Sequence, residues 1–538
     1  MKPGTQRGTI IAAASPPPSP DELARALEAY LADHPHAVLL EEGRVAFDLR
    51  TAKYAIAAEH GRCTLQLWSD ERNLVRRVTG VYERNGLLRI ATLKFGQTRT
   101  QTLELAPDRD LRPPSTRNAA RKLYLRTLER VWLRHFPEWR QDAFRTAMDL
   151  ERSFGPAYAR GVLVRGQSAW AVIGIGAEET QSSIDGILTL GILWLAHCRE
   201  HAGGRRLFEG LKVIVPKGAA ALTASRMVWL SPAAARWELW ELDMRSEELQ
   251  PRDLADQGNL ATRLLHAPNV EAARERFADA IARVRSLLPE SIRDEVQQVA
   301  RSGAELAFCL HGLEFARVRV AVSATSFNRE EELTFGAGAN ETPLSAENEQ
   351  NFSALLRELA VRRHADGDSR DPLYRMQPER WLESVLRGNV EPLDDHLDAA
   401  HVYTQVPAFA AGDRGMLDLL SVTRDGRLAV IELKADEDLH LALQGLDYWV
   451  RVRWHLQQSD HATGLPEFQR HGYFGGVQIS PLPPRLYLVA PALRIHPATE
   501  IVLKYFKPEV DWTLVAIDER WRDEVRVVFR KRSPGQQA

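Results

Sequence analysis

Three ionisable residues in the last third of the chain have the types and spacing that phosphodiester chemistry needs. Asp418 interrupts the apolar run MLDLLSV, and Glu432 and Lys434 end a second apolar run, LAVIELK. The turn signal Arg424-Asp425-Gly426 between the runs predicts a β-hairpin that brings Asp418 close to both. Because side chains two positions apart in a strand point to the same side, Glu432 and Lys434 are expected to share one face.

Two carboxylates and an ammonium on an apolar hairpin are costly unless they are paired or bind a metal. Mg²⁺ takes oxygen ligands, so Asp418, Glu432 and the carbonyl of Leu433 could hold Mg²⁺ or Mn²⁺. Such an ion polarises a phosphate and lowers the pKa of a bound water. Lys434 could orient that water and stabilise charge that builds on the phosphate. The alternative is a structural carboxylate–lysine ion pair, which the additional Asp418 disfavours.

This pattern resembles the PD-(D/E)xK nuclease superfamily over residues 376–530. Asp418 precedes Glu432-Leu433-Lys434 by 14 residues, and the next helix carries Gln444 and Tyr448. Their spacing is that of the Gln-xxx-Tyr signature of RecB-like and lambda-exonuclease-like members. The resemblance implies a restriction-endonuclease-like αβ core and a catalytic role for both residues. It also implies a nuclease that leaves a 5′-phosphate, although Leu417 replaces the proline that often precedes the first aspartate.

The resemblance further implies an opening helix with another glutamate near the metal. The segment PERWLESVLRGN (378–389) fits, with Glu383 as the candidate and Glu379, one turn earlier, as its competitor. An ordinary half-buried helix is the alternative explanation for Gln444 and Tyr448. Helical spacing places His440 and Arg451 on the face of that pair.

Basic residues suggest where nucleic acid could bind. The helix predicted at 117–134 carries a stripe at four-residue steps, and the helix after the hairpin continues as RVRWH. The candidate phosphate contacts are Lys122, Arg126, Arg130, Arg134, Arg451 and Arg453. A solvated helix face is the alternative for the stripe. The Gly-rich segment 457–484, with His461, Arg470, His471 and Tyr473, is either a lid or strand-separating element or a disordered insertion.

An internal repeat is visible when residues 161–201 are aligned with 419–459 at an offset of 258, with eight identities. Downstream the offset becomes 275, so the second copy carries about 17 extra residues. The first copy has Arg160, Gly174, Gly176 and Gly186 in place of Asp418, Glu432, Lys434 and Gln444. We therefore expect a degenerate, metal-free copy, with chance similarity between αβ patterns as the alternative.

Composition sets the wider frame. The 538 residues are too many for one core, and the formal charge of −2 neither favours nor excludes nucleic acid. Three dispersed cysteines and the absence of a signal or membrane segment favour a cytoplasmic protein.

The expected fold class is mixed α/β, with each αβ copy preceded by a small β-rich unit and a helix expected at 142–153. The predicted organisation is a disordered leader (1–20), a β-rich unit (21–105), a degenerate nuclease-like domain (106–250), a helical connector (251–300), a second β-rich unit plus helix (301–370) and the nuclease domain (376–530).

The function expected is that of a magnesium-dependent nuclease acting on nucleic acid, with DNA as the expected substrate and no membrane partner. A homodimer is left open. The alternative is a catalytically silent, nuclease-derived scaffold that binds nucleic acid or assembles with a partner.

Overall fold

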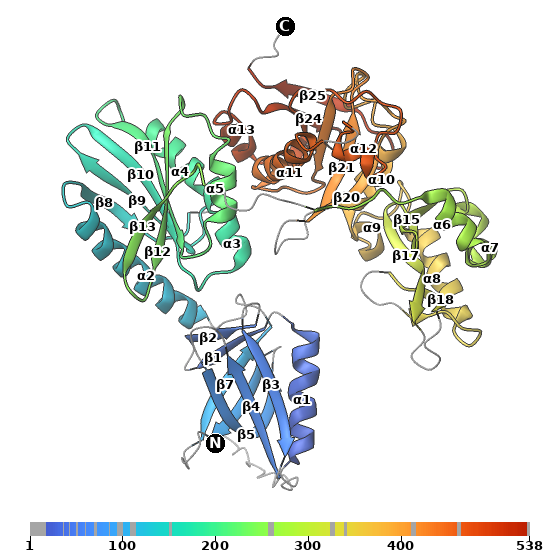
Figure 1. Cartoon of the computed structure of the whole chain (residues 1–538), viewed down its shortest axis with the longest axis horizontal. Helices are drawn as coiled ribbons and strands as arrows, with labels where there is room; N and C mark the ends of the chain where they lie inside the picture. Colours follow the sequence, from blue (N-terminus) through green and yellow to red (C-terminus); the bar gives the residue numbers. More distant parts are fainter. Residues whose placement is uncertain are drawn as a thin grey trace, which may run out of the picture.

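The computed structural model describes residues 18–534, apart from 36, 42–43, 50–51, 60, 69–72, 85–86, 94–99, 108–113, 150–152, 257–262, 323–328, 338–341, 410–415 and 460–463. The chain is mixed α/β and is built around four sheets (Figure 1). Within these ranges, no helix combines the length and the apolar character needed to cross a membrane. Most of the predicted leader, residues 1–17, lies outside the described residues.

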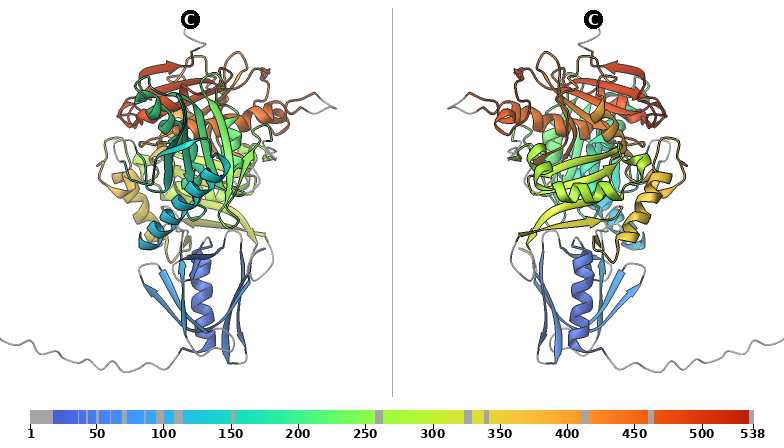
Figure 2. Two further views of the ribbon diagram at one scale, coloured as in Figure 1. Left: turned by 90° about the vertical axis from the view of Figure 1, so that its left-hand side faces the viewer. Right: turned by 90° about the vertical axis from the view of Figure 1, so that its right-hand side faces the viewer.

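The first unit is a helix packed on a seven-stranded antiparallel sheet in the order β2-β1-β7-β6-β5-β4-β3. Ser19 and Glu22 form a capping box at the start of α1, and the helix buries Leu23, Leu27 and Leu31 against the sheet. Figures 1 and 2 show this unit below the rest of the chain. Its elements are α1 (Pro20–Asp33), β1 (Val38–Glu41), β2 (Arg44–Asp48), β3 (Lys53–Glu59), β4 (Arg62–Trp68), β5 (Asn73–Arg84), β6 (Leu87–Leu93) and β7 (Gln101–Ala106).

The first αβ unit has a six-stranded mixed sheet in the order β13-β12-β11-β10-β9-β8. Its elements are α2 (Pro114–His135), β8 (Arg140–Arg145), β9 (Tyr158–Arg165), β10 (Ser168–Ile175), α3 (Gln181–Asp185), α4 (Ile187–Glu200), β11 (Leu207–Pro216), α5 (Ala221–Met227), β12 (Arg236–Asp243) and β13 (Glu248–Arg252). The helix predicted at 142–153 is wrong, because this segment begins inside β8, which pairs with β9.

The second αβ unit has a seven-stranded sheet in the order β14-β20-β21-β22-β23-β24-β25. Its elements are β14 (Arg263–Leu264), α10 (Pro378–Gly388), β20 (Tyr403–Phe409), β21 (Met416–Val422), β22 (Leu428–Leu433), α11 (Leu441–Leu456), α12 (Glu467–Arg470), β23 (Arg485–Pro491), α13 (Pro497–Leu503), β24 (Asp511–Ile517) and β25 (Val527–Arg532).

The two αβ units share element order and strand directions. In each, a helix precedes two antiparallel strand pairings, then two parallel pairings with helices between them, then an antiparallel edge strand. The series β8–β13 has these directions, and β20–β25 repeats them strand for strand. Helix α4 takes the place of α11, and α5 takes the place of α13.

The helices of the two units meet in one shared apolar core. Helix α4 packs against α13 while α5 packs against α11, so each contact is the counterpart of the other. The segments that follow α5 and α13 pair as well, since Ser231 N–H donates to the Tyr505 carbonyl (2.7 Å) and Lys507 N–H to the Trp229 carbonyl (2.9 Å). One continuous buried cluster runs from Phe154 to Leu514 through both units. The units are therefore two halves of one packed body.

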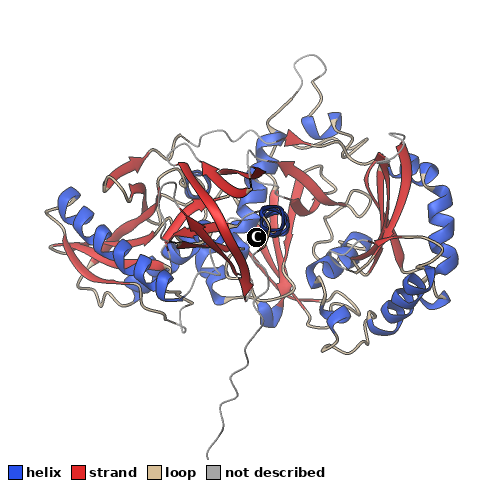
Figure 3. Ribbon diagram, turned by 90° about the horizontal axis from the view of Figure 1, so that it is seen from below, coloured by secondary structure: helices blue, strands red, loops and turns tan. Residues whose placement is uncertain are grey.

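The second β unit contains helices as well as strands, so the predicted helical connector 251–300 is only partly right. It comprises α6 (Val270–Arg276), α7 (Ala278–Leu287), β15 (Val296–Ser302), β16 (Glu305–Leu310), β17 (Leu313–Val322), β18 (Arg329–Phe335), β19 (Thr342–Pro343) and α8 (Glu349–Arg362), with α9 (Pro372–Arg375) after it. Phe277 and Val284 of the supposed connector are buried in the same core as Phe352 of α8, because their apolar side chains need a sheet to cover them. Figures 1 and 3 place these helices on the outer side of the sheet.

Glycine in β10 makes room for a buried tyrosine in the first αβ unit. A Cβ on Gly174 would lie 2.4 Å from the hydroxyl oxygen of Tyr124, which comes from α2. Gly176 also faces the Tyr124 ring, at 3.3 Å. The tyrosine hydroxyl is buried and has no hydrogen-bond partner among the described atoms. An aromatic side chain thus fills the space in front of β10.

Gly174→Ala is expected to lower the midpoint of thermal unfolding, because overpacking a filled core costs about 1–3 kcal/mol. Adding Tyr124→Phe should recover most of the loss, since the hydroxyl is the nearest atom and the next contacts lie at 3.4 Å. Gly155→Ala is the matched control, as nothing lies within 4 Å of its Cβ position. Equal unfolding midpoints for Gly174→Ala and the control would contradict this packing.

Candidate active site

The predicted hairpin is confirmed and it brings the acidic residues together. Strands β21 and β22 pair antiparallel, with Leu419 opposite Ile431, and Gly426 adopts a φ of 84° in the connecting turn. The Leu433 N–H donates to Asp418 Oδ2 at 3.0 Å, which ties the first carboxylate to the end of the second strand. Asp418, Glu432 and Lys434 line one cavity of about 370 Å³.

Lys434 lies among carboxylates rather than beside a single one. Its Nζ is 3.2 Å from Glu432 Oε1, 3.7 Å from Asp438 Oδ2 and 3.8 Å from Glu379 Oε1. Burial by itself lowers the pKa of Lys434, but the surrounding carboxylates outweigh burial and raise it. The ammonium is therefore held in its charged form.

The two strand carboxylates are destabilised as anions. Burial raises the pKa of Glu432 well above its usual range, and the nearby Asp418 adds to the effect. Burial also raises the pKa of Asp418, although the Leu433 N–H opposes it. A neighbouring divalent cation would favour the ionised form of both groups.

The side chains present fit a hard divalent cation. Glu432 Oε2 is buried and finds no hydrogen-bond partner among the described atoms, so one carboxylate oxygen is available to a ligand. Asp418 faces the same cavity, and Leu433, whose carbonyl was predicted as a ligand, is the last residue of β22. Oxygen-only donors of this kind suit Mg²⁺ or Mn²⁺.

A second acidic group lies elsewhere in this unit. Asp394, Asp395 and His396 bring three potential ligand atoms within 4.8 Å of one another. Asp394 is already occupied, because it accepts from the Tyr487 hydroxyl at 2.8 Å and is bonded to the His396 ring at 2.9 Å. These bonds explain the cluster as a polar turn on the surface.

Helix α11 supplies the wall of the cavity. Gln444, Tyr448 and Arg451 all line it, as the spacing predicted, and the Arg451 guanidinium lies 5.8 Å from the Tyr448 ring centre. Gly445 allows the close approach, because a Cβ there would meet Leu488 at 2.4 Å. The Gln444 side-chain oxygen is buried without a partner among the described atoms, so it too is available to a ligand.

Two other residues, the N-cap residue His440 of α11 and Arg453 within it, do not face the cavity. His440 Nδ1 is bonded to Thr189 Oγ1 of α4 at 2.9 Å. The Arg453 guanidinium lies 4.8 Å from the Trp229 ring centre, so this predicted phosphate contact instead packs against the first αβ unit. Helical spacing alone could not separate the two sides, because the sequence does not show that α11 packs against the first αβ unit.

Helix α10 places its two glutamates differently. Glu379 lines the same cavity as Asp418 and Glu432, whereas Glu383 lines the neighbouring pocket. Glu383 Oε2 accepts from Arg380 at 2.9 Å and from Gln405 at 2.7 Å. Burial raises the pKa of Glu383 to about 8, despite the opposing effect of Arg380. The predicted competitor is thus the closer of the two to Lys434.

The basic stripe on α2 is remote from this cavity, which no α2 residue lines. Arg130 and Arg134 both pair with Glu247, and Arg121 donates to buried Glu179 at 2.6 Å. Lys122 and Arg126 are exposed. Part of the stripe is therefore neutralised within the first αβ unit.

The segment 457–484 is packed in its described part. Phe468, Tyr473 and Phe474 are buried, and the Phe474 N–H donates to the Tyr403 hydroxyl at 2.8 Å. Glu467 is bonded to the His455 ring at 2.7 Å. His461 lies outside the described residues.

Three polar cavity residues were missed from the sequence, namely Arg380, Gln405 and Asp447, together with the apolar Met416. Gln405 has a φ of 52° and drops out of the β20–β21 pairing opposite Asp418, as strained residues at functional sites do. Nothing in the run YTQVPAF signals this conformation. Asp447 could have been suspected from its place between Gln444 and Tyr448.

Glu383→Gln is expected to raise the unfolding midpoint by an amount that grows from about pH 5 to about pH 8 and then stays constant. Between its usual value of 4.5 and the native value of about 8, the folded state holds a proton that the unfolded state has released. The stability of the native protein therefore falls as the pH rises from about 5 to about 8, and the glutamine variant does not show this fall. Thermal unfolding in EDTA at several pH values measures the difference in midpoint, with exposed Glu509→Gln as the control. A difference in midpoint that does not change with pH would refute the raised pKa of Glu383.

Comparison of the chain with protein-family models, with curated proteins and with solved structures found no match in any of the three. The chemistry of the cavity has to be inferred from its own side chains.

Proposed function

We propose that the chain is a metal-dependent nuclease whose active site is the cavity between β21, β22, α10 and α11. One observation carries the proposal: Asp418, Glu432, Lys434, Gln444 and Tyr448 line a single cavity in which a buried Glu432 oxygen has no partner among the described atoms. The spacing that resembles the PD-(D/E)xK superfamily supports it. The restriction-endonuclease-like assignment of the second αβ unit is part of the same proposal.

Asp418 and Glu432 would hold Mg²⁺ or Mn²⁺, with the Leu433 carbonyl beside them. When bound, the ion supplies polarisation of the phosphate and a lowered pKa for water. Lys434, kept charged by its carboxylate neighbours, positions the attacking water and stabilises negative charge on the phosphate. Arg380 and Arg451 line the same cavity and are suited to phosphate oxygens of the strand.

The first αβ unit fits a degenerate copy of the second. The supporting observations are the shared element order and strand directions together with the tyrosine that fills the space in front of Gly174. On this proposal the first copy has a structural role, because Arg226 of its helix α5 fixes the position of α11. Arg226 donates to Asp447 at 2.8 Å and 2.6 Å, and both side chains are largely buried.

Glu432→Gln and Lys434→Ala are each expected to slow cleavage of DNA by at least about a hundredfold while nucleic-acid binding is retained. The substitutions remove a metal ligand and a charge-stabilising group. A gel assay on linear, circular and single-stranded DNA with Mg²⁺ or Mn²⁺ measures the rate. Glu509→Gln and Lys504→Ala, both exposed in the same unit, should cut at the native rate. Undiminished cleavage by either active-site variant would refute the assignment.

Calorimetry with Mn²⁺ tests the metal site without any activity. We expect binding by the native chain, loss of binding in Asp418→Ala, and an affinity that rises with pH because Asp418 and Glu432 must release protons. Asp395→Ala is the control, since it alters the exposed acidic cluster alone. If the control lost Mn²⁺ binding, or if Asp418→Ala bound Mn²⁺ as tightly as the native chain, the metal site would lie outside the hairpin.

A further inference from the structure

A second polar pocket adjoins the catalytic cavity and belongs partly to the second β unit. It encloses about 240 Å³ between β15–β17 and α10. Arg380 and Gln405 line both spaces, so the two are neighbours. Apart from Arg380, none of its charged side chains takes part in the proposed active site.

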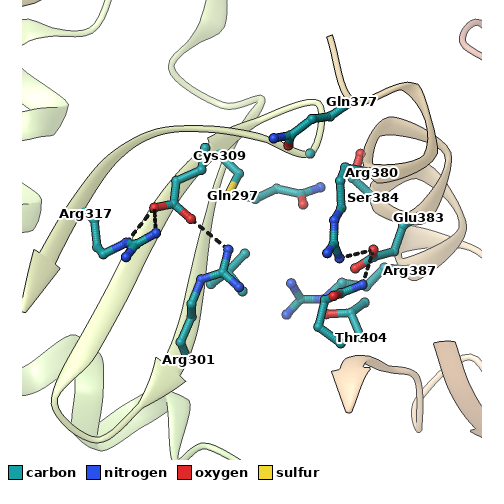
Figure 4. A pocket seen from close by; sticks show the side chains of 14 residues that line it. Gln297, Arg301, Cys309, Arg317, Gln377, Arg380, Glu383, Ser384, Arg387 and Thr404 are labelled. Atoms are coloured by element: carbon teal, nitrogen blue, oxygen red, sulfur yellow. Dashed lines mark hydrogen bonds and ion pairs between the residues drawn. The ribbon is translucent and has the colours of Figure 1, made fainter. Parts of the chain in front are cut away.

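Arginine dominates the charges around this pocket. Arg301 and Arg317 come from the strands, whereas Arg380 and Arg387 come from α10 (Figure 4). The two strand arginines share one carboxylate, Glu314, at 2.7 Å and 2.6 Å. With Glu383, and with Glu305, which lies 3.5 Å from Arg317, four guanidinium groups face three carboxylates.

Arg387 is the arginine of this pocket whose charge is not neutralised. Its side chain makes no hydrogen bond or ion pair with another residue in the described ranges. Figure 4 shows Arg301 and Arg387 reaching into the pocket from opposite sides. Like charges that face each other in a partly enclosed space repel, and an anion between them reverses the sign of the interaction.

Two further features mark the pocket as a built site. Gln377 and Gln405 both line it and both have positive φ, 48° and 52°, a conformation that non-glycine residues keep only where the surroundings enforce it. The Gln405 amide nitrogen donates to Glu383 Oε2 at 2.7 Å, which fixes the position of that carboxylate beside the arginines. The strain fixes polar groups at the boundary between pocket and cavity.

We propose that this pocket binds a phosphate group of the nucleic-acid strand, next to the phosphate being cut. Guanidinium groups bind phosphate oxygens in a bidentate fashion, and several arginines on two rigid elements suit that geometry. The second β unit is then a substrate clamp that sets where the strand enters the catalytic cavity. This inference rests on the proposed nuclease function for its choice of ligand.

Binding of a fluorescein-labelled single-stranded DNA of about 12 nucleotides, followed by anisotropy in EDTA, tests the pocket without cleavage. Arg301→Gln and Arg387→Gln should each weaken binding about tenfold and lower the slope of log affinity against log salt by about 0.7. Arg301→Lys keeps the charge but not the bidentate geometry, so it should keep the native salt slope while recovering only part of the affinity. Arg357→Gln, an exposed arginine on α8 of the same unit, should bind like the native chain. Thermal unfolding checks that every variant is folded.

The outcomes separate this inference from the nuclease assignment. Native affinity and salt slope in both pocket variants, with cleavage intact, would overturn the clamp alone. If both pocket variants bind more weakly but the native chain cuts no DNA with Mg²⁺ or Mn²⁺, the phosphate site is supported and the nuclease is refuted. Native protein that binds no oligonucleotide overturns the clamp, whereas the nuclease assignment is decided by the cleavage assay with Mg²⁺ or Mn²⁺.

Calorimetry with thymidine 5′-monophosphate distinguishes a strand phosphate from a free nucleotide. Weak binding of the nucleotide, reduced in Arg301→Gln, supports the pocket as a phosphate site when oligonucleotide binding falls in parallel. Nucleotide binding lost in the variant while oligonucleotide affinity is unchanged would overturn the assignment to the strand.

Discussion

The burial of Glu432 beside Asp418 is the constraint on which the C-terminal half depends. Glu432 is 2% exposed, and four carboxylates, those of Glu379, Asp418, Glu432 and Asp438, act on the single ammonium of Lys434. An isolated buried anion is among the most costly features a fold can hold. A divalent cation in this oxygen-lined cavity, as proposed for the metal site, would relieve the excess of negative charge. The apolar strands around it supply the stability that this arrangement costs.

Helix α11 has to satisfy two environments at once. One side presents Gln444 and Tyr448 to the cavity, while the other is embedded in the core shared with the first αβ unit. Arg226, 8% exposed, binds both oxygens of Asp447, itself a cavity residue. Removing one partner of such a buried pair typically costs about 3–5 kcal/mol. The first unit therefore fixes the position of the α11 side of the cavity, although none of the residues that line the cavity belongs to it.

Local pattern was enough to predict the hairpin, the α11 face and the opening helix from sequence. Strand alternation, an Asp-Gly turn and four-residue helical spacing are set by neighbours along the chain, so Asp418, Glu432, Lys434, Gln444 and Tyr448 could be placed together. The positions of Arg453 and Gln405 could not. Arg453 packs on Trp229 in the core shared by the two αβ units. Gln405 has a φ of 52° and is left out of the pairing between β20 and β21. Both depend on contacts distant in sequence, as does the membership of α6 and α7 in the second β unit.

The difference between the two αβ units lies in the helix that precedes each sheet. Helix α10 brings Glu379 to the carboxylates of β21 and β22, whereas α2 brings Tyr124 against Gly174, the counterpart of Glu432. On the proposed duplication, loss of the strand glutamate and gain of the tyrosine are coupled. Any side chain at position 174 collides with Tyr124, and without a large side chain at position 124 the glycine would leave a cavity. On this proposal, no single substitution could restore a strand carboxylate at position 174 of the first αβ unit. This explains how one chain can carry two similar units, one with the space in front of its strand filled by tyrosine and one with an open cavity.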